Sequence, residues 1–237
     1  MTAQPNAERA ALVTGAARGL AQAIVADLSA RGFRVAFTFR PSGTPPDETL
    51  ALARHEAATV VAIPCDHGLE GATLGAVRAA EETIGPIDTL VHTVGPMIAR
   101  RFERSTLDDY REMIDANLRS AVEAARGVLP GMRERRFGRL VYFGMHGSHA
   151  TLPMRGLTLY GAAKAAVVAF ARGLALEEKG RGITVNVVEP GDIRDKSQES
   201  PAAREVVEAV RLLTAAETGF LNGVVLNVGG GIAVVSE

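Results

Sequence analysis

The chain has 237 residues, of which 47% are apolar and 22% charged, and its formal net charge is -1. These values indicate one globular α/β domain over residues 1–237, and they exclude a charge excess that would gather nucleic acid or anionic lipid. Cys65 is the single cysteine, so an internal disulfide is excluded, and no Cys/His spacing suggests a metal site. Without a secretion signal or a long uncharged apolar run, the chain is expected to lie in the cytoplasm and not in a membrane.

Seven short apolar runs are predicted strands, and helical patterns alternate with them. The runs are continuous in hydrophobicity, which is typical of parallel strands covered on both faces. Because parallel neighbours need crossover connections, the pattern predicts a doubly wound, seven-stranded parallel sheet with helices on both faces. Thr106 and Asp109 have the spacing of a helix capping box. The strands are expected at 10–14, 33–39, 59–64, 87–94, 138–144, 182–190 and 223–230, and the helices at 19–31, 47–57, 69–84, 106–136, 158–180 and 202–217.

The stretch TGAARGLA (14–21) follows the first predicted strand and opens the first helix. Backbone N–H groups and the helix dipole at such a turn can hold the pyrophosphate of a dinucleotide. Two glycines alone are also compatible with a plain tight turn, so the strand–turn–helix context is what favours binding. The candidate contacts are Gly15, Arg18, Gly19 and Leu20.

In YGAAK (160–164), Tyr160 and Lys164 lie four residues apart, on one face of a predicted helix. Carbonyl reduction needs a hydride donor, an acid for the developing alkoxide and hydrogen bonds that stabilise its charge. A tyrosine can supply the acid, and a lysine one turn away favours the phenolate that forms. The spacing therefore predicts an acid/base pair.

These motifs resemble those of the short-chain dehydrogenases/reductases. TGAARGL matches the family's nucleotide loop, YGAAK matches its YxxxK motif, and GITVNVVEPGDI (182–193) matches its sixth strand and the PG loop that follows. The resemblance covers essentially the whole chain and is nearest to 3-oxoacyl-[acyl-carrier-protein] reductases. It implies a Rossmann fold, a nicotinamide dinucleotide, a small-molecule carbonyl substrate and a homodimer or homotetramer. Ala21 replaces the third glycine, from which we expect a small packing adjustment.

The resemblance also assigns roles to single residues. Asn117 in DANLRS (115–120) would join a proton relay to Lys164, although a buried amide can equally bend a helix as a packing group. In HTVG (92–95) only Gly95 matches the family, and His92 is favoured as a structural group at a strand end. The implied cofactor contacts are Asp66, Gly95, Tyr160, Lys164, Pro190, Gly191 and Ile193.

Phe39 stands where an NAD-specific site has a carboxylate for the ribose 2′-hydroxyl. Arg40 follows it, and Arg18 lies in the glycine loop. Two guanidinium groups suit a phosphate dianion, so the sequence predicts NADP(H). The alternative is that both arginines are solvated surface charges.

The family's activating serine has no plain counterpart. Counting back from Tyr160 reaches Gly147, and counting forward from the fifth predicted strand reaches Met145; neither can donate. We favour Ser148 as the catalytic donor, with His146 second. The remaining alternative is that Ser148 and His149 only shape a glycine-containing turn.

Together these features predict an NADP(H)-dependent oxidoreductase that reduces a ketone or aldehyde, possibly a 3-oxoacyl thioester, with Tyr160 as the acid. One rival is a pterin-like C=N or C=C reductase, in which the serine is dispensable. Another is a protein that binds or senses NADP(H) without turnover. The segment 190–223 is shorter than usual for the family, which indicates an open site, and Met154 and Leu157 are candidates for its apolar lining.

Overall fold

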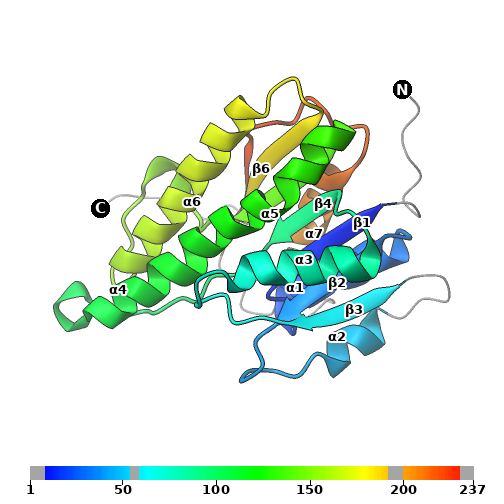
Figure 1. Cartoon of the computed structure of the whole chain (residues 1–237). Coiled ribbons are helices and arrows are strands. Elements are labelled where there is room, and N and C mark those ends of the chain that lie inside the picture. The colour runs from blue at the N-terminus through cyan, green and yellow to red at the C-terminus, as the bar shows by residue number, and fades with distance from the viewer. Residues whose placement is uncertain (1–8, 54–58, 192–199, 230–237) are drawn as a thin grey trace.

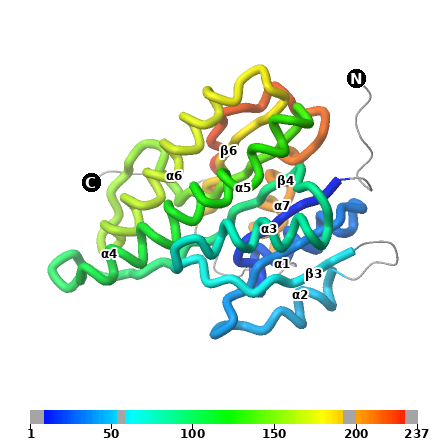
Figure 2. Tube along the Cα trace, viewed as in Figure 1, coloured from blue at the N-terminus to red at the C-terminus, as the bar shows by residue number. Residues whose placement is uncertain are grey.

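The computed structural model of the chain describes residues 9–53, 59–191 and 200–229. Among these residues, seven parallel strands form one sheet in the order β3-β2-β1-β4-β5-β6-β7 (Figure 1). β1 lies inside the sheet, with the strands that follow it first along the chain (blue to cyan) on one side and the last strands (yellow to red) on the other (Figure 2). The strands are β1 Ala10–Thr14, β2 Arg34–Phe39, β3 Val60–Pro64, β4 Thr89–His92, β5 Gly138–Phe143, β6 Ile183–Pro190 and β7 Val225–Val228.

The strand order reverses between β1 and β4. Thr14 pairs with His92 at the carboxyl ends of these two strands. In open α/β sheets, ligands bind beyond the carboxyl ends of the strands at such a reversal. The topology therefore points to a site beside Thr14 and His92.

Helices cover both faces of the sheet. Successive strand residues point to opposite faces, so Leu12 belongs to the core under α3, α5 and α6, and Val13 to the core under α1 and α7. Thr106 and Asp109 form the predicted capping box at the start of α4. The helices are α1 Gly19–Ala30, α2 Asp47–Leu52, α3 Ala72–Ile84, α4 Leu107–Ile114, α5 Ser120–Arg135, α6 Thr158–Glu177 and α7 Pro201–Thr214.

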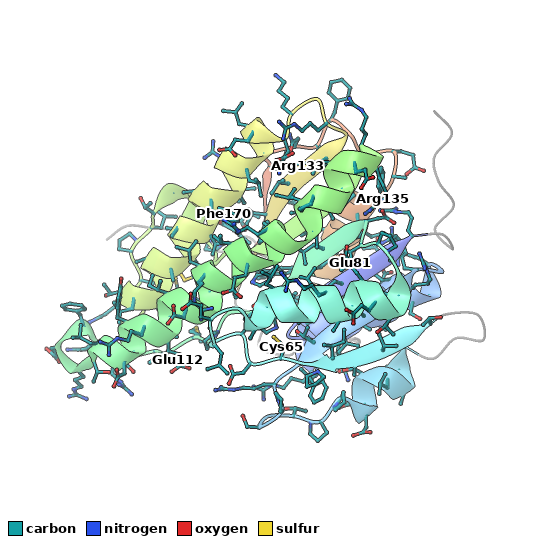
Figure 3. The ribbon with its side chains drawn as sticks, viewed as in Figure 1. Cys65, Glu81, Glu112, Arg133, Arg135 and Phe170 are labelled. Atoms are coloured by element: carbon teal, nitrogen blue, oxygen red, sulfur yellow. The ribbon has the colours of Figure 1, made fainter. Side chains whose placement is uncertain are left out.

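By length and composition alone, α6 could cross a membrane. Core helices of globular proteins pass the same test, and α6 is placed as one of them. Val167 and Ala171 are buried in the core between α6 and the sheet, and the ring of Phe170 packs edge-on against Tyr142 of β5 (Figure 3). The apolar character of α6 is thus explained by packing and does not indicate a membrane protein.

Candidate active site

A cleft of about 880 Å³ opens between the glycine loop, the carboxyl end of β5 and the start of α6. Methionine and leucine side chains, Met97, Met145, Met154 and Leu157, form an apolar wall. An adjoining hollow of about 600 Å³ lies over the end of β2 and includes Arg40. Of the residues expected from the sequence, the cleft collects Gly15, Arg18, Gly19, Leu20, Gly95, Tyr160, Lys164, Pro190 and Gly191.

The glycine loop has the conformation that a phosphate cradle requires. Gly15 and Gly19 have positive φ angles of 69° and 66°, which side chains other than glycine adopt rarely. A Cβ at Gly15 would also lie 3.0 Å from Val94 Cγ2. The first turn of α1 contains no acidic residue, so its free N–H groups leave a positive end toward the cleft. These features fit a dinucleotide pyrophosphate.

The hollow beside the cleft carries two positive side chains. Arg18 and Arg40 both line it, together with Phe39, and its lining has no carboxylate among the described residues. Arg40 Nε lies 3.1 Å from Asp66 Oδ2 in a solvent-exposed ion pair. Exposed pairs of this kind contribute about 0–1 kcal/mol, so Arg40 can exchange Asp66 for a stronger anion at little cost.

Tyr160 and Lys164 share one face of α6, as expected from their spacing. The Lys164 Nζ atom lies 5.7 Å from the centre of the Tyr160 ring and donates to the Phe143 carbonyl at 3.0 Å. Burial lowers the pKa of Lys164 to about 8 and raises the pKa of Tyr160 to about 12. The tyrosine pKa is thus shifted opposite to the direction expected from the lysine, and the cause is desolvation by burial.

Asn117 lies in a π-helical turn, Asp115–Arg119, between α4 and α5. Its Nδ2 donates to Met113 O at 2.9 Å and to Pro96 O at 3.3 Å, whereas its buried Oδ1 has no hydrogen-bond partner. A Cβ placed on Gly95 would collide with both Asn117 Oδ1 and Lys164 Nζ. Because residue 95 has no side chain, Asn117 Oδ1, which has no hydrogen-bond partner, and the Lys164 ammonium can both lie against it at one edge of the cleft.

Ser148, expected as the catalytic donor, is hydrogen-bonded within the turn after β5. Its hydroxyl donates to Glu189 Oε1 at 2.7 Å and accepts from the Met145 N–H at 3.1 Å. The residue is buried and is not part of the cleft lining. In this arrangement its single proton is donated to a buried carboxylate. His146, the second candidate, does line the cleft.

His92 takes the structural place that was favoured for it. Its ring nitrogens lie 3.0 Å from Thr14 Oγ1 and 3.1 Å from Ser120 Oγ, and the residue does not line the cleft. Burial holds its pKa well below the ordinary value. Ile193, expected to meet the nicotinamide, lies outside the described residues.

The motifs and spacings of the sequence did not predict a role for Glu189 or Met97. Glu189 is fully buried at the end of β6, and Met97 is a mostly exposed part of the cleft wall. The sequence contains one indication of the role of Glu189: a carboxylate inside the apolar run GITVNVVEP requires a buried partner. The sequence contains no such indication for Met97, because its place in the cleft wall depends on how the loop after β4 folds.

A doubly wound sheet with a glycine loop at its reversal point and a tyrosine–lysine pair across the same cleft defines an α/β oxidoreductase. The chain belongs to the short-chain dehydrogenase family, whose model matches residues 9–205. The family and fold expected from the motifs are thereby confirmed.

Among its relatives, 3-oxoacyl-[acyl-carrier-protein] reductase MabA of Mycobacterium tuberculosis is 30% identical over 249 residues, covering 97% of this chain and 95% of the relative. The reductase FabG of Salmonella typhimurium is 31% identical over 243 residues, covering 95% and 97%. A blue fluorescent protein from a metagenomic library, in complex with NADPH, superposes with a TM-score of 0.87 at 28% identity, covering 97% and 100%. A short chain dehydrogenase from Burkholderia cenocepacia, in complex with NADP, gives 0.84 at 29% identity, covering 96% and 99%.

Proposed function

We propose that the chain is a cytoplasmic, NADP(H)-dependent reductase of ketones or aldehydes, with Tyr160 as the general acid. The observation that carries this proposal is the cleft that joins the glycine loop of α1 to the Tyr160–Lys164 pair of α6. When bound, the dinucleotide supplies the hydride. The protein's own part is to hold the substrate oxygen beside an acid and to stabilise the charge that develops on it.

Each proposed catalytic residue has one task. The Tyr160 hydroxyl keeps its proton at neutral pH, since burial raises its pKa, and it gives that proton to the substrate oxygen. The Lys164 ammonium favours the phenolate left behind. Asn117 Oδ1 is free to accept a hydrogen bond from a water molecule and to hold it beside Lys164. A proton from that water would replace the one that Lys164 passes on to the tyrosine.

The dinucleotide is proposed to be NADP(H) because Arg18 and Arg40 line one hollow, and no carboxylate stands among the lining residues that the structure describes. The neighbours solved with NADPH and NADP support this choice. The substrate is proposed to be a 3-oxoacyl thioester, in line with the names of the relatives. The apolar wall of Met97, Met145, Met154 and Leu157 suits an acyl chain.

The cofactor proposal predicts a selective loss of affinity. Charge-assisted contacts contribute about 1.5–3 kcal/mol each, so Arg18→Ala with Arg40→Ala should weaken NADPH binding about 100-fold or more and NADH binding far less. Titration of cofactor fluorescence measures both dissociation constants. Arg78→Ala, an exposed arginine on α3, is the matched control and should change neither. Equal weakening of the two dinucleotides by the double variant would refute NADP selectivity.

Substrate class is tested by following NADPH absorbance with oxoacyl thioesters, diketones and pterins. Turnover of oxoacyl thioesters alone would support the proposed substrate. The position of Ser148 outside the cleft favours one rival, a pterin-like reductase, and turnover of pterins alone would establish that reading. Tight NADPH binding without any turnover would indicate a cofactor-sensing protein.

Self-association is also proposed, as a homodimer or homotetramer. Large apolar side chains are exposed on and before α4, including Phe102 and Leu107, and Phe220 is fully exposed before β7. Closed symmetric assembly would cover such surfaces. Light scattering coupled to size exclusion would measure the subunit number, and a monomer would contradict the proposal.

A further inference from the structure

Two peptides of the glycine loop are fixed by other segments of the fold. The peptide between Thr14 and Gly15 is held at both ends. Its N–H donates to Thr38 Oγ1 of β2 at 2.7 Å, and its carbonyl oxygen accepts from the Thr93 hydroxyl. The next peptide is held by the same residue of β2, because the Ala16 N–H donates to Thr38 O at 2.8 Å. Thr38 therefore anchors two successive peptides of the loop.

The loop needs such anchors because it has a glycine where it borders the cleft. Gly15 lines the cleft with a φ of 69°, and without a Cβ its peptides can take other orientations at low cost. A dinucleotide binds only those molecules whose loop N–H groups are correctly oriented. The apparent affinity is proportional to the fraction of molecules in that orientation. Contacts that fix the Gly15 peptide therefore raise affinity without touching the dinucleotide.

The side chain of Thr38 is itself held by a histidine. Thr38 is fully buried, and its Oγ1 lies 2.7 Å from Nε2 of His67, in the loop after β3. On the other side of the ring, Nδ1 lies 2.8 Å from Oγ1 of Thr73 in the first turn of α3. A neutral imidazole has one donor and one acceptor in either tautomer, so it can bridge two hydroxyl groups. The ring thus connects β2 to α3.

His67 does not itself border the ligand site. It lines neither the cleft nor the hollow over the end of β2. An imidazole buried without hydrogen bonds costs free energy, and an apolar side chain of similar volume would fill the same space without that cost. The two bonds of the ring are therefore what distinguishes histidine from leucine at this position. One of these bonds ends at the hydroxyl that holds Gly15.

We infer that His67 is a positioning residue for the dinucleotide: by holding the Thr38 hydroxyl, it keeps the Gly15 peptide in the orientation that the pyrophosphate needs. This inference rests on the proposed dinucleotide binding. The contacts run from Thr73 through His67 and Thr38 to the Gly15 N–H. Because NADPH and NADH share the pyrophosphate, His67 supports the binding of both. The arginine pair of the hollow, in contrast, distinguishes the two by the 2′-phosphate.

The first test measures the dissociation constants of NADPH and NADH by cofactor fluorescence. One lost hydrogen bond corresponds to about 2–10-fold, so His67→Leu should weaken both dinucleotides by the same factor in that range. His67→Gln keeps a donor and an acceptor and should restore most of the affinity. Ser29→Ala removes a buried hydroxyl that donates to Ala53 O at 2.6 Å. It is the matched control for lost stability and should change neither constant.

A double-mutant cycle tests whether His67 acts through Thr38. Thr38→Val removes the hydroxyl that accepts from the Gly15 N–H, so adding His67→Leu to it should weaken the dinucleotides no further. In the protein without dinucleotide, His67→Leu should speed hydrogen exchange of the Gly15 amide, measured by NMR. The KM for NADPH should rise in His67→Leu. Its kcat at saturating NADPH should stay unchanged, because the lost binding is common to ground state and transition state.

Several outcomes would overturn the inference. Unchanged dissociation constants in a folded His67→Leu, or additive losses in the cycle, would do so and leave the proposed reductase intact. An equal loss in Ser29→Ala would do the same, since it would show a general effect of stability. If His67→Leu does not fold, unchanged binding by Thr38→Val overturns the inference by itself. A wild type that binds neither dinucleotide would refute the proposed function and the inference together, whereas tight binding without carbonyl reduction would refute the proposed reduction alone.

Discussion

At the residue scale, burial and charge oppose each other at the tyrosine–lysine pair. Tyr160 is held neutral by desolvation, and the buried Lys164 ammonium is destabilised so that its pKa falls to about 8. A neutral tyrosine is the form needed to protonate an alkoxide, and a charged lysine is the form needed to stabilise the phenolate. Reduction therefore requires a pH below the lysine pKa.

This balance predicts a fall in the reduction rate as pH rises through about 8, where Lys164 loses its proton and its charge. Lys164→Arg stays charged throughout, because the arginine pKa lies far higher. The ratio of wild-type to variant kcat should therefore decrease above this pH, whatever the variant's absolute rate. Stopped-flow measurement of NADPH consumption at saturating substrate gives both profiles. If kcat of wild type and of Lys164→Arg changed with pH in parallel, titration of Lys164 would be excluded as the cause of the fall in rate.

Residue roles could be predicted where they depend on local spacing. Tyr160 and Lys164 are four positions apart, and one helical turn brings them together in any helix. Ser148 could not be placed this way, since its hydroxyl is taken by Glu189, 41 residues away in the chain. The number of residues from a motif predicts where a residue lies along the backbone. It does not predict which residue, distant in sequence, forms a hydrogen bond with its side chain.

At the element scale, the apolar runs and helical patterns predicted the order and type of the sheet and its main helices. The helix expected at 106–136 differs, because a π-helical turn at Asp115–Arg119 separates α4 from α5. There Asn117 Nδ2 donates to Met113 O and Ser120 Oγ donates to Ala116 O. In both bonds a side chain donates to the carbonyl four residues earlier, where the backbone N–H of an α-helix would donate. The spacing of apolar residues does not predict this competition between side chain and backbone.

The turn after β5 depends on Glu189, which predicts a large stability effect. The Glu189 carboxylate accepts hydrogen bonds from the Gly147 N–H, the Ser148 hydroxyl and the His149 N–H. Glu189→Ala leaves these donors without their acceptor, and two of them are buried, so we expect a loss of about 3 kcal/mol in unfolding free energy. Urea denaturation measures this loss. Glu208→Ala on α7, where the side chain is 62% exposed, is the matched control and should change stability by less than about 0.5 kcal/mol. Equal effects of the two substitutions would contradict the anchoring role.

At the scale of the whole molecule, two buried histidines link the strands around the glycine loop. His67 Nε2 lies 2.7 Å from Thr38 Oγ1, and this hydroxyl oxygen accepts a hydrogen bond from the Gly15 N–H. His92 joins Thr14 to Ser120. Burial lowers the pKa of His67 from 6.5 to about 4, so both rings are neutral in the folded protein at physiological pH.

Because the unfolded chain binds these protons more readily, stability should fall as pH drops from about 6.5 toward 4. For His67 the full difference corresponds to about 3 kcal/mol. Urea midpoints at successive pH values measure the loss. Acidic groups with lowered pKa values, such as Asp109 and Glu178, add their own loss of stability once pH falls below about 5, so the histidine slope is measured above that pH. His67→Gln should reduce the slope. A wild-type stability that is flat between neutral and mildly acidic pH would contradict the prediction.

The central claim is that Tyr160 delivers the proton in an NADPH-dependent carbonyl reduction. Single-turnover oxidation of NADPH by wild type and Tyr160→Phe, on a carbonyl substrate that wild type reduces, tests it most directly. General acid catalysis contributes about 10²–10⁴-fold, so the variant should lose that much rate while binding NADPH as tightly as wild type. A variant that reduces the substrate at the wild-type rate would contradict the account.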